Sequence, residues 1–213
     1  MSQLCYFDYA ATTPVRGEVI AAMTAALEQF GNPSSRYPYG AQAAKRVKED
    51  RATVAQALGC QAGEVIFTSG GTEGDNWAIS LAAHLGRHRG KHIITTAVEH
   101  AAVLEPCKAL EAQGYQVTYL TPGPDGRVKV ADLEAALRPD TVLVSMMLVN
   151  NETGAIQPVK EAGQVLRRCR SQALLHTDAI QGFLKIPFTP EALGVDLLTV
   201  SGHKIGAMKG SGA

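Results

Sequence analysis

The sequence predicts an α/β fold with a mainly parallel sheet and helices on both of its faces. From residue 64 onward, short apolar runs alternate with amphipathic segments of helical length, and the connections between them are short. Such alternation is typical of strands joined by helices that cross over a parallel sheet. One apolar run, 195–200, is bounded by Gly194 and Gly202, as expected for a buried parallel strand.

The elements follow one another without a repeat or an interdomain linker. Residues 1–14 are predicted to form an extended arm ending at Pro14, and residues 15–213 one large domain. A helix is expected over 18–30, a loop over 32–40 and a second helix over 41–58, because glycines follow both helical patterns. Strands are then expected at 64–68, 92–96, 115–120, 141–149, 173–177 and 195–200, with helices near 72–85, 101–113, 131–138 and 158–170.

Composition excludes several classes of partner. The 20 basic residues balance the 20 acidic ones, so charge favours neither nucleic acid nor an anionic membrane. No apolar run approaches the ~20 residues of a membrane span, and the first residues do not resemble a signal peptide. The four cysteines form no CxxC pair, which favours a cytoplasmic protein with reduced thiols. His84 and His88 have no third ligand in the pattern, so we expect no metal site.

Two residues near strand ends indicate pyridoxal phosphate (PLP) chemistry. Lys204 follows the strand at 195–200, and Asp178 ends the strand before it. Open α/β sheets bind ligands beyond the carboxyl ends of their strands. A desolvated lysine there can attack an aldehyde, and a carboxylate can face a pyridine nitrogen. The alternative is a solvated lysine and a helix-capping aspartate.

A phosphate site is predicted at the turn Thr68-Ser69-Gly70-Gly71-Thr72-Glu73. Glycines let the backbone approach an anion, and the amides that open the following helix attract one. The Thr72 hydroxyl can add a donor, and Ser201 and His203 can reach the same phosphate from the far strand. The spacing is neither that of a Walker loop nor GxGxxG. The alternative is an ordinary turn with Thr72 as a helix cap.

Three further polar residues are candidates for the same site. His100 can stack on a cofactor ring or move protons, although a histidine at a helix start also serves as a cap. In Asn150-Asn151 one amide can bind the cofactor or substrate, with an Asx turn as the alternative. Gln181 lies one turn after Asp178 and can reach the same phenolic oxygen of the cofactor. The alternative is that it belongs to a surface helix. Thr72, His100, Asn151, Asp178 and Lys204 each follow a different expected strand, and this shared placement favours one common site.

At this point the sequence resembles a known family, the cysteine desulfurases of the class V branch of fold-type I PLP enzymes. The matching motifs, in order, are Phe7-Asp8-Tyr9-Ala10-Ala11-Thr12-Thr13-Pro14, Gly31-Asn32-Pro33-Ser34-Ser35, Thr68-Ser69-Gly70-Gly71-Thr72-Glu73, Glu99-His100, Val149-Asn150-Asn151-Glu152-Thr153-Gly154, Asp178-Ala179-Ile180-Gln181 and Ser201-Gly202-His203-Lys204. The resemblance implies that 15–213 form the PLP-binding large domain, about the first half of a family member, with the C-terminal small domain absent.

The resemblance also implies a role for each matching residue. Lys204 would carry the internal aldimine and move the proton, and Asp178 would keep the pyridine nitrogen protonated. His100 would stack on the ring, with Gln181 and Asn151 around the phenolic oxygen. The phosphate would be held by Thr72, Ser201, His203 and the Gly71 backbone. The implied reaction takes sulfur from L-cysteine, giving alanine and a persulfide on an enzyme cysteine, and passes it to a sulfur acceptor such as an iron–sulfur scaffold protein.

The match departs from the family in three ways. The family's persulfide cysteine and its substrate-binding arginine lie beyond the part matched, so none of the four cysteines is assigned that role. Residues 205–210 lack the family's aromatic residue and proline, and Tyr37-Pro38-Tyr39 replaces a histidine-containing stretch.

Other functions fit the same motifs. A selenocysteine lyase or another class V aminotransferase would keep the fold and change the chemistry. A non-catalytic truncated module would bind no cofactor. The family resemblance further implies a homodimer whose sites are completed across the interface.

Overall fold

The computed structural model describes residues 5–213 and contains a five-stranded parallel sheet. Its strands are β1 (His92–Thr96), β2 (Gln116–Leu120), β3 (Thr141–Ser145), β4 (Leu174–Asp178) and β5 (Leu197–Thr199). Their order across the sheet is β2-β1-β3-β4-β5, and every pairing is parallel. The α/β class predicted from the sequence is therefore confirmed.

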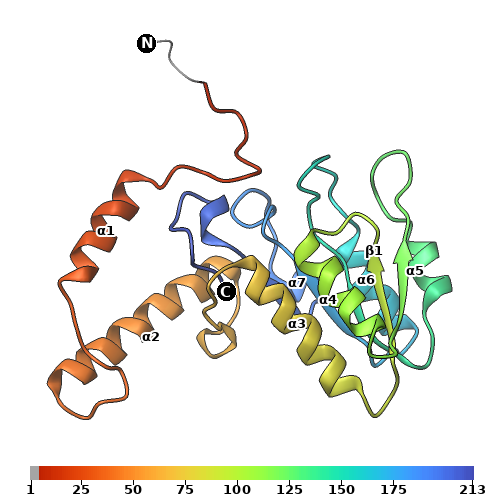
Figure 1. The fold of residues 1–213 in the computed structure, drawn as a ribbon, viewed down its shortest axis with the longest axis horizontal. Coiled ribbons are helices and arrows are strands. Elements are labelled where there is room, and N and C mark those ends of the chain that lie inside the picture. The colour runs from red at the N-terminus through yellow and green to blue at the C-terminus, as the bar shows by residue number, and fades with distance from the viewer. Residues whose placement is uncertain (1–4) are drawn as a thin grey trace.

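Six helices occur where the sequence predicts them, with ends that differ by a few residues (Figure 1). They are α1 (Gly17–Leu27), α2 (Pro38–Leu58), α3 (Gly71–Gly86), α4 (Ala101–Glu111), α5 (Val130–Ala136) and α6 (Val159–Arg168). The sequence did not predict the short α7 (Pro190–Leu193) or the 3₁₀ turns at Ala62–Glu64 and Gly202–Lys204.

Helices cover both faces of the sheet. Successive side chains of a strand point to opposite faces, and β1 shows the consequence. Ile93 belongs to one buried cluster with Ile79 of α3 and Val103 of α4, whereas Ile94 belongs to a second cluster with Leu133 of α5 and residues of α6. Because both faces are covered, every residue of β1 and of β3 is buried, as is usual in parallel sheets.

The strand expected at 64–68 is wrong. The segment begins in the 3₁₀ turn, and only Thr68 pairs, through an isolated antiparallel bridge to Gly212. The apolar side chains of Ile66 and Phe67 remain 53% and 43% exposed. The apolar run favours an extended chain, but a strand also needs a neighbouring backbone over several residues, and here the paired backbone is limited to the bridge at Gly212.

Two element ends also differ from the prediction. The loop expected over 32–40 ends earlier, because α2 begins at Pro38. Proline suits the first turn of a helix, where its missing N–H costs no hydrogen bond and its φ is already helical. The strand expected over 141–149 ends at Ser145, although residues 146–148 stay buried.

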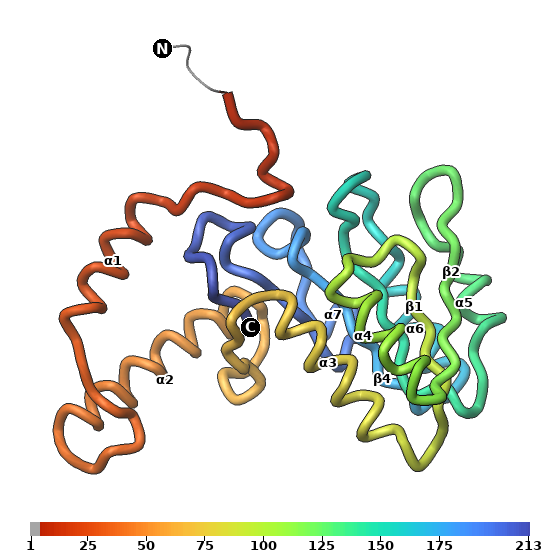
Figure 2. Tube along the Cα trace, in the orientation of Figure 1, coloured from red at the N-terminus to blue at the C-terminus, as the bar shows by residue number. Residues whose placement is uncertain are grey.

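The first part of the described chain extends away from the sheet, as the traces in Figures 1 and 2 show. Residues 5–16 contain no helix or strand, and no residue of α1 is buried. The apolar side chains of α1 are therefore partly or largely exposed, with Leu27 84% exposed. The division into an arm at 1–14 and a domain at 15–213 stays a prediction; residues 1–4 lie outside the described part. Within residues 5–213, no helix combines the length and apolarity that a membrane span requires.

Candidate functional site

One cavity of about 540 Å³ lies at the carboxyl ends of the strands, and it is lined by every residue that the sequence singles out for cofactor binding. These residues are Gly71, Thr72, His100, Asn151, Asp178, Gln181, Ser201, His203 and Lys204. The structure thus brings together side chains from five separate segments. Their individual roles remain predictions.

The first turn of α3 forms one end of the cavity. Its N-cap is Gly70, with φ of 151°, and no side chain caps the helix. The alternative that Thr72 is the cap is therefore wrong. Uncapped amides at the start of a long helix attract anions, and Ser201 and His203 line the same cavity from the segment after β5. This corner has the donors that a phosphate requires.

Lys204 and Asp178 both line the cavity beyond the phosphate corner. The Lys204 amine donates hydrogen bonds to the carbonyl oxygens of Ala10 at 2.5 Å and Ala11 at 2.8 Å. Partial burial lowers the pKa of this amine, against the attraction of Asp178 and Asp8. A lowered pKa increases the fraction of neutral amine, which is the nucleophilic form.

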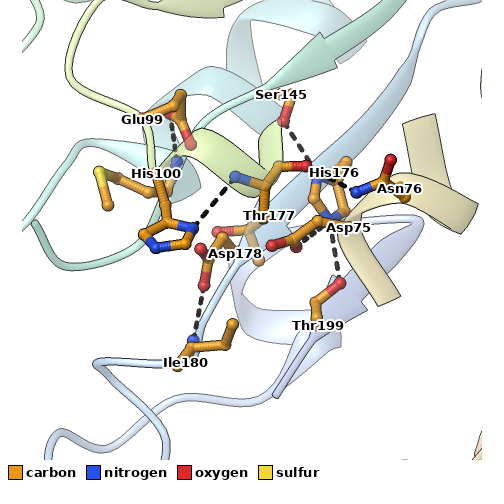
Figure 3. Close-up of polar contacts among 12 residues, drawn as sticks. Asp75, Asn76, Glu99, His100, Ser145, His176, Thr177, Asp178, Ile180 and Thr199 are labelled. Atoms are coloured by element: carbon orange, nitrogen blue, oxygen red, sulfur yellow. Dashed lines mark hydrogen bonds and ion pairs between the residues drawn. The ribbon is translucent and has the colours of Figure 1, made fainter. Parts of the chain in front are cut away.

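Asp178 is the last residue of β4 and is 5% exposed. Its Oδ1 accepts a hydrogen bond from the Ile180 N–H at 2.9 Å (Figure 3). Burial raises the pKa of this carboxyl, while the Ile180 N–H, His100 and Lys204 oppose the shift. A cationic group in the cavity would therefore gain a partly desolvated counter-ion.

His100 combines the two roles that the sequence left open. It is the N-cap of α4, and its Nδ1 accepts a hydrogen bond from the Ala102 N–H at 3.1 Å. A ring that accepts at Nδ1 carries its proton on Nε2 when it is neutral. The capping bond therefore fixes the orientation of an imidazole that also lines the cavity.

The neighbouring asparagines divide the two roles suggested for them. Asn150 is buried, and its Oδ1 accepts hydrogen bonds from the backbone of Glu152 and Thr153. This is the Asx turn that the sequence offered as the alternative. The turn leaves Asn151 as the asparagine that lines the cavity.

Gln181 is held at both ends of its amide. Its Oε1 accepts from the Lys185 amine at 3.0 Å, and its Nε2 donates to the Ala10 carbonyl oxygen at 2.9 Å. Since lysine can only donate, this contact fixes which end of the amide is the oxygen. The surface-helix alternative is wrong, because Gln181 is only 9% exposed.

The N-terminal arm forms a wall of the site, which its description as an extended arm did not predict. Asp8, Ala10 and Ala11 line the cavity. The arm is tied down at Thr13, whose N–H donates to the His203 carbonyl oxygen at 2.9 Å. The signal available in the sequence was the motif Phe7–Pro14, which carries polar residues without an apolar period.

Three buried titratable residues behind the cavity were also missed. Asp75, Glu99 and His176 are 0%, 6% and 0% exposed. Asp75 had a visible signal, since its spacing places it in the buried stripe of α3 with Gly71 and Ile79.

Glu99 is a buried acid with one satisfied oxygen. Its Oε1 accepts from the Met147 N–H at 2.7 Å and the Thr96 hydroxyl at 2.8 Å, whereas Oε2 has no hydrogen-bond partner among residues 5–213. Burial raises the pKa of Glu99 to about 8, although these two hydrogen bonds lower it. Glu99 is therefore mainly protonated at neutral pH.

Replacing Glu99 with glutamine should flatten the pH dependence of stability. The folded protein keeps a proton that the unfolded chain, with a glutamate pKa of roughly 4.3, releases. Stability due to this group is thus complete below pH ~4.5 and declines as pH rises to about 8. The decline is at most about 1.4 kcal/mol per pH unit.

Urea denaturation at several pH values between 4.5 and 8.5 measures this slope. Glu99→Gln should reduce it and should be at least as stable as wild type at pH 8.5. Glu161→Gln, on the exposed side of α6, is the matched control and should leave the slope unchanged. An unaltered slope in Glu99→Gln would show that Glu99 is ionised when folded.

Within residues 5–213 no group of three or more histidine, cysteine or acidic side chains is arranged to hold a metal ion.

The chain is similar in sequence and in fold to known proteins. A family model described as class V aminotransferase matches residues 5–213. The chain belongs to the class V aminotransferase family. Among its members, a protein from Methanosarcina thermophila named cysteine desulfurase IscS is 47% identical over 209 residues, covering 98% of this chain and 51% of that protein. Cysteine desulfurase 2 from Trichormus variabilis is 49% identical over 209 residues, covering 98% of this chain and 52% of that protein.

Two solved structures have a similar fold. A structure named NifS-like protein superposes with a TM-score of 0.94 at 40% identity, covering 97% of this chain and 57% of that one. A structure titled SspA in complex with cysteine superposes with a TM-score of 0.91 at 39% identity, covering 97% of this chain and 59% of that one. The chain spans about half the length of the curated relatives it matches, as the motifs led us to expect.

The side chains present fit the cofactor implied by the class V family. The cavity has an uncapped helix start for a phosphate, a lysine of lowered pKa for an aldehyde and a buried carboxyl for a ring nitrogen. Asp178 is the decisive part of this fit, because a buried carboxyl at a cavity wall is costly without a cationic partner.

Proposed function

We propose that this chain is the PLP-binding part of a cysteine desulfurase, which takes sulfur from L-cysteine and leaves L-alanine. The observation that carries the proposal is the convergence of all nine candidate residues, from Gly71 to Lys204, on one cavity. The names of the relatives support the same activity, and one solved neighbour is described in complex with cysteine.

PLP, when bound, supplies an aldehyde that captures the substrate amine and a ring that accepts electrons from it. The chain supplies the surroundings. The first turn of α3 would hold the phosphate, with Thr72, Ser201 and His203. Asp178 would keep a proton on the ring nitrogen, His100 would lie against the ring, and Asn151 and Gln181 would bind the phenolic oxygen. The Lys204 amine would be the attachment point of the cofactor and the base that moves a proton at the substrate carbon.

The sulfur-accepting cysteine is proposed to lie outside these 213 residues. None of the four cysteines, at positions 5, 60, 107 and 169, lines the cavity. Cys107 is fully buried, and burial raises the pKa of its thiol to about 12, which disfavours the reactive thiolate. Transfer to an iron–sulfur scaffold or another acceptor, a homodimeric assembly and a cytoplasmic location form part of the same proposal. Two exposed aromatic rings, Phe7 in the arm at 91% and Phe30 after α1 at 75%, support an assembly that covers them.

A cofactor titration of the 213-residue chain tests the proposal. Adding PLP should produce a new visible absorbance band, and pyridoxal, which lacks the phosphate, should bind at least about tenfold more weakly because the α3 amides lose their anion. L-cysteine should then change the spectrum of the bound cofactor, with L-alanine as the control amino acid.

Each alternative has its own outcome. A spectral response to selenocysteine but not to cysteine would indicate a selenocysteine lyase, and exchange of the amino group with a keto acid would indicate an aminotransferase. No binding of PLP at all would contradict the proposal and favour a non-catalytic module.

A further inference from the structure

Asp75 is a carboxyl enclosed by protein, and the proposed reaction does not use it. It lies in the buried stripe of α3, one turn after Gly71, and is 0% exposed. Neither of its carboxyl oxygens has a hydrogen-bond partner of good geometry among residues 5–213. In the view of Figure 3 its carboxyl lies between the His176 ring and Asp178. A buried carboxyl in such a place must either meet a cation or stay protonated.

The nearest basic group, His176, does not supply that cation. Its Nε2 lies 3.5 Å from Asp75 Oδ1 and 3.2 Å from the Thr199 hydroxyl, and its Nδ1 lies 2.9 Å from the Ser145 hydroxyl. The ring is fully buried, and burial lowers its pKa to about 4. His176 is therefore neutral near pH 7. A neutral ring has one nitrogen without a hydrogen, and this nitrogen can accept a hydrogen bond from a carboxylic acid.

The surroundings of Asp178 favour an ionised carboxyl more than those of Asp75 do. Asp178 accepts a hydrogen bond from the Ile180 N–H, and the electrostatic effects of His100 and Lys204 lower its pKa and so favour its ionised form. Burial, and then the negative charge of Asp178, raise the pKa of Asp75 to about 9, with a smaller electrostatic effect from Glu99 and against a hydrogen bond with the Thr199 side chain. Neighbouring buried carboxyls cannot all ionise. The Ile180 N–H, His100 and the Lys204 amine thus place the negative charge on Asp178 and the proton on Asp75.

We propose that Asp75 is a positioning residue that keeps its proton, directs that O–H toward His176 Nε2 as a hydrogen-bond donor, and so leaves Asp178 as the anion that would meet the PLP ring nitrogen. This inference rests on the proposed function, because it concerns the same cofactor. An ionised Asp75 would repel the Asp178 anion from behind and make it a weaker partner for a cation. Without its proton, Asp75 could not donate a hydrogen bond to His176 Nε2. The loss of this contact would loosen α3, which carries the phosphate-binding turn.

Two substitutions separate this role from simple filling of space. Asp75→Ala removes both the donor and the volume, and it should weaken PLP binding by about tenfold and lower the midpoint of urea unfolding. Asp75→Asn keeps an uncharged donor of the same shape, and it should restore PLP binding to within about threefold of wild type. If asparagine binds PLP as poorly as alanine, the carboxyl is needed as a charge and the proposal is overturned.

A spectroscopic measurement tests the protonation state without any cofactor. Infrared spectra of protein with ¹³C-labelled aspartate should show a protonated carboxyl band at pH 7 that is lost in Asp75→Asn. In wild type, ¹⁵N NMR of labelled histidine should show His176 as a neutral ring at pH 7. An imidazolium ring, or a band that persists in Asp75→Asn, would overturn the proposal even if the variants fold poorly. Wild-type protein that binds no PLP would instead contradict the proposed function, and the infrared and NMR results would still decide the state of Asp75.

Discussion

Replacing Lys204 with alanine is expected to abolish covalent retention of PLP. The Lys204 amine lines the cavity and has a lowered pKa, and alanine offers no nucleophile in its place. After incubation with PLP and borohydride reduction, intact-mass measurement should show the cofactor increment on wild type and none on Lys204→Ala. Peptide mapping should place the increment on residue 204.

The matched control is Lys209→Ala, which changes an exposed lysine in the following turn. It should retain the full increment. A Lys204→Ala protein that still carries the cofactor at one defined lysine would refute the assignment of the attachment site. The two carbonyls that lose their hydrogen bond are on the arm, so circular dichroism should show an unchanged domain.

Replacing Asp178 with asparagine should weaken PLP affinity by about a hundredfold or more. A buried charge pair that loses one partner costs roughly 3–5 kcal/mol, and about 1.4 kcal/mol corresponds to a factor of ten. The stability of the cofactor-free protein should change in the opposite direction. Burial raises the Asp178 pKa, so ionisation of this carboxyl lowers the free energy of unfolding as pH rises. The protein with the neutral amide should therefore be at least as stable as wild type at pH 8.

Fluorescence titration with PLP and urea denaturation measure these two quantities on the same protein. Asp132→Asn, an exposed acid at the start of α5, should alter neither. A loss of affinity accompanied by an equal loss of stability at pH 8 would indicate a structural role for Asp178 and contradict its pairing with the cofactor.

The site could be predicted from the sequence because its residues follow strand ends. Parallel strands bring their carboxyl ends to one edge of the sheet, so His100, Asn151, Asp178 and Lys204 meet once β1, β3, β4 and β5 align. Local patterns sufficed for this inference. They failed at 64–68, where extended conformation was correct but strand pairing depends on a backbone far away in the chain.

Long-range packing also explains the residues that were missed. The wall formed by the arm depends on contacts such as that of the Thr13 hydroxyl with the His203 carbonyl oxygen, 190 residues away. Asp75 and Glu99 are both buried in the folded chain, and for Glu99 the local sequence pattern gave no signal of burial. The stripe on α3 predicts burial at position 75, but the protonation of that carboxyl depends on neighbours from β4, from β5 and from Glu99, which follows β1.

The bridge between Thr68 and Gly212 has a consequence for the order of folding. It joins segments separated by most of the chain, and Gly212 also pairs with Ser201, which lines the cavity. Closing so long a loop costs entropy that only a nearly complete structure repays. The turn that follows Thr68 and opens α3 therefore reaches its final geometry late, and acquisition of an anion there marks the end of folding rather than an early step.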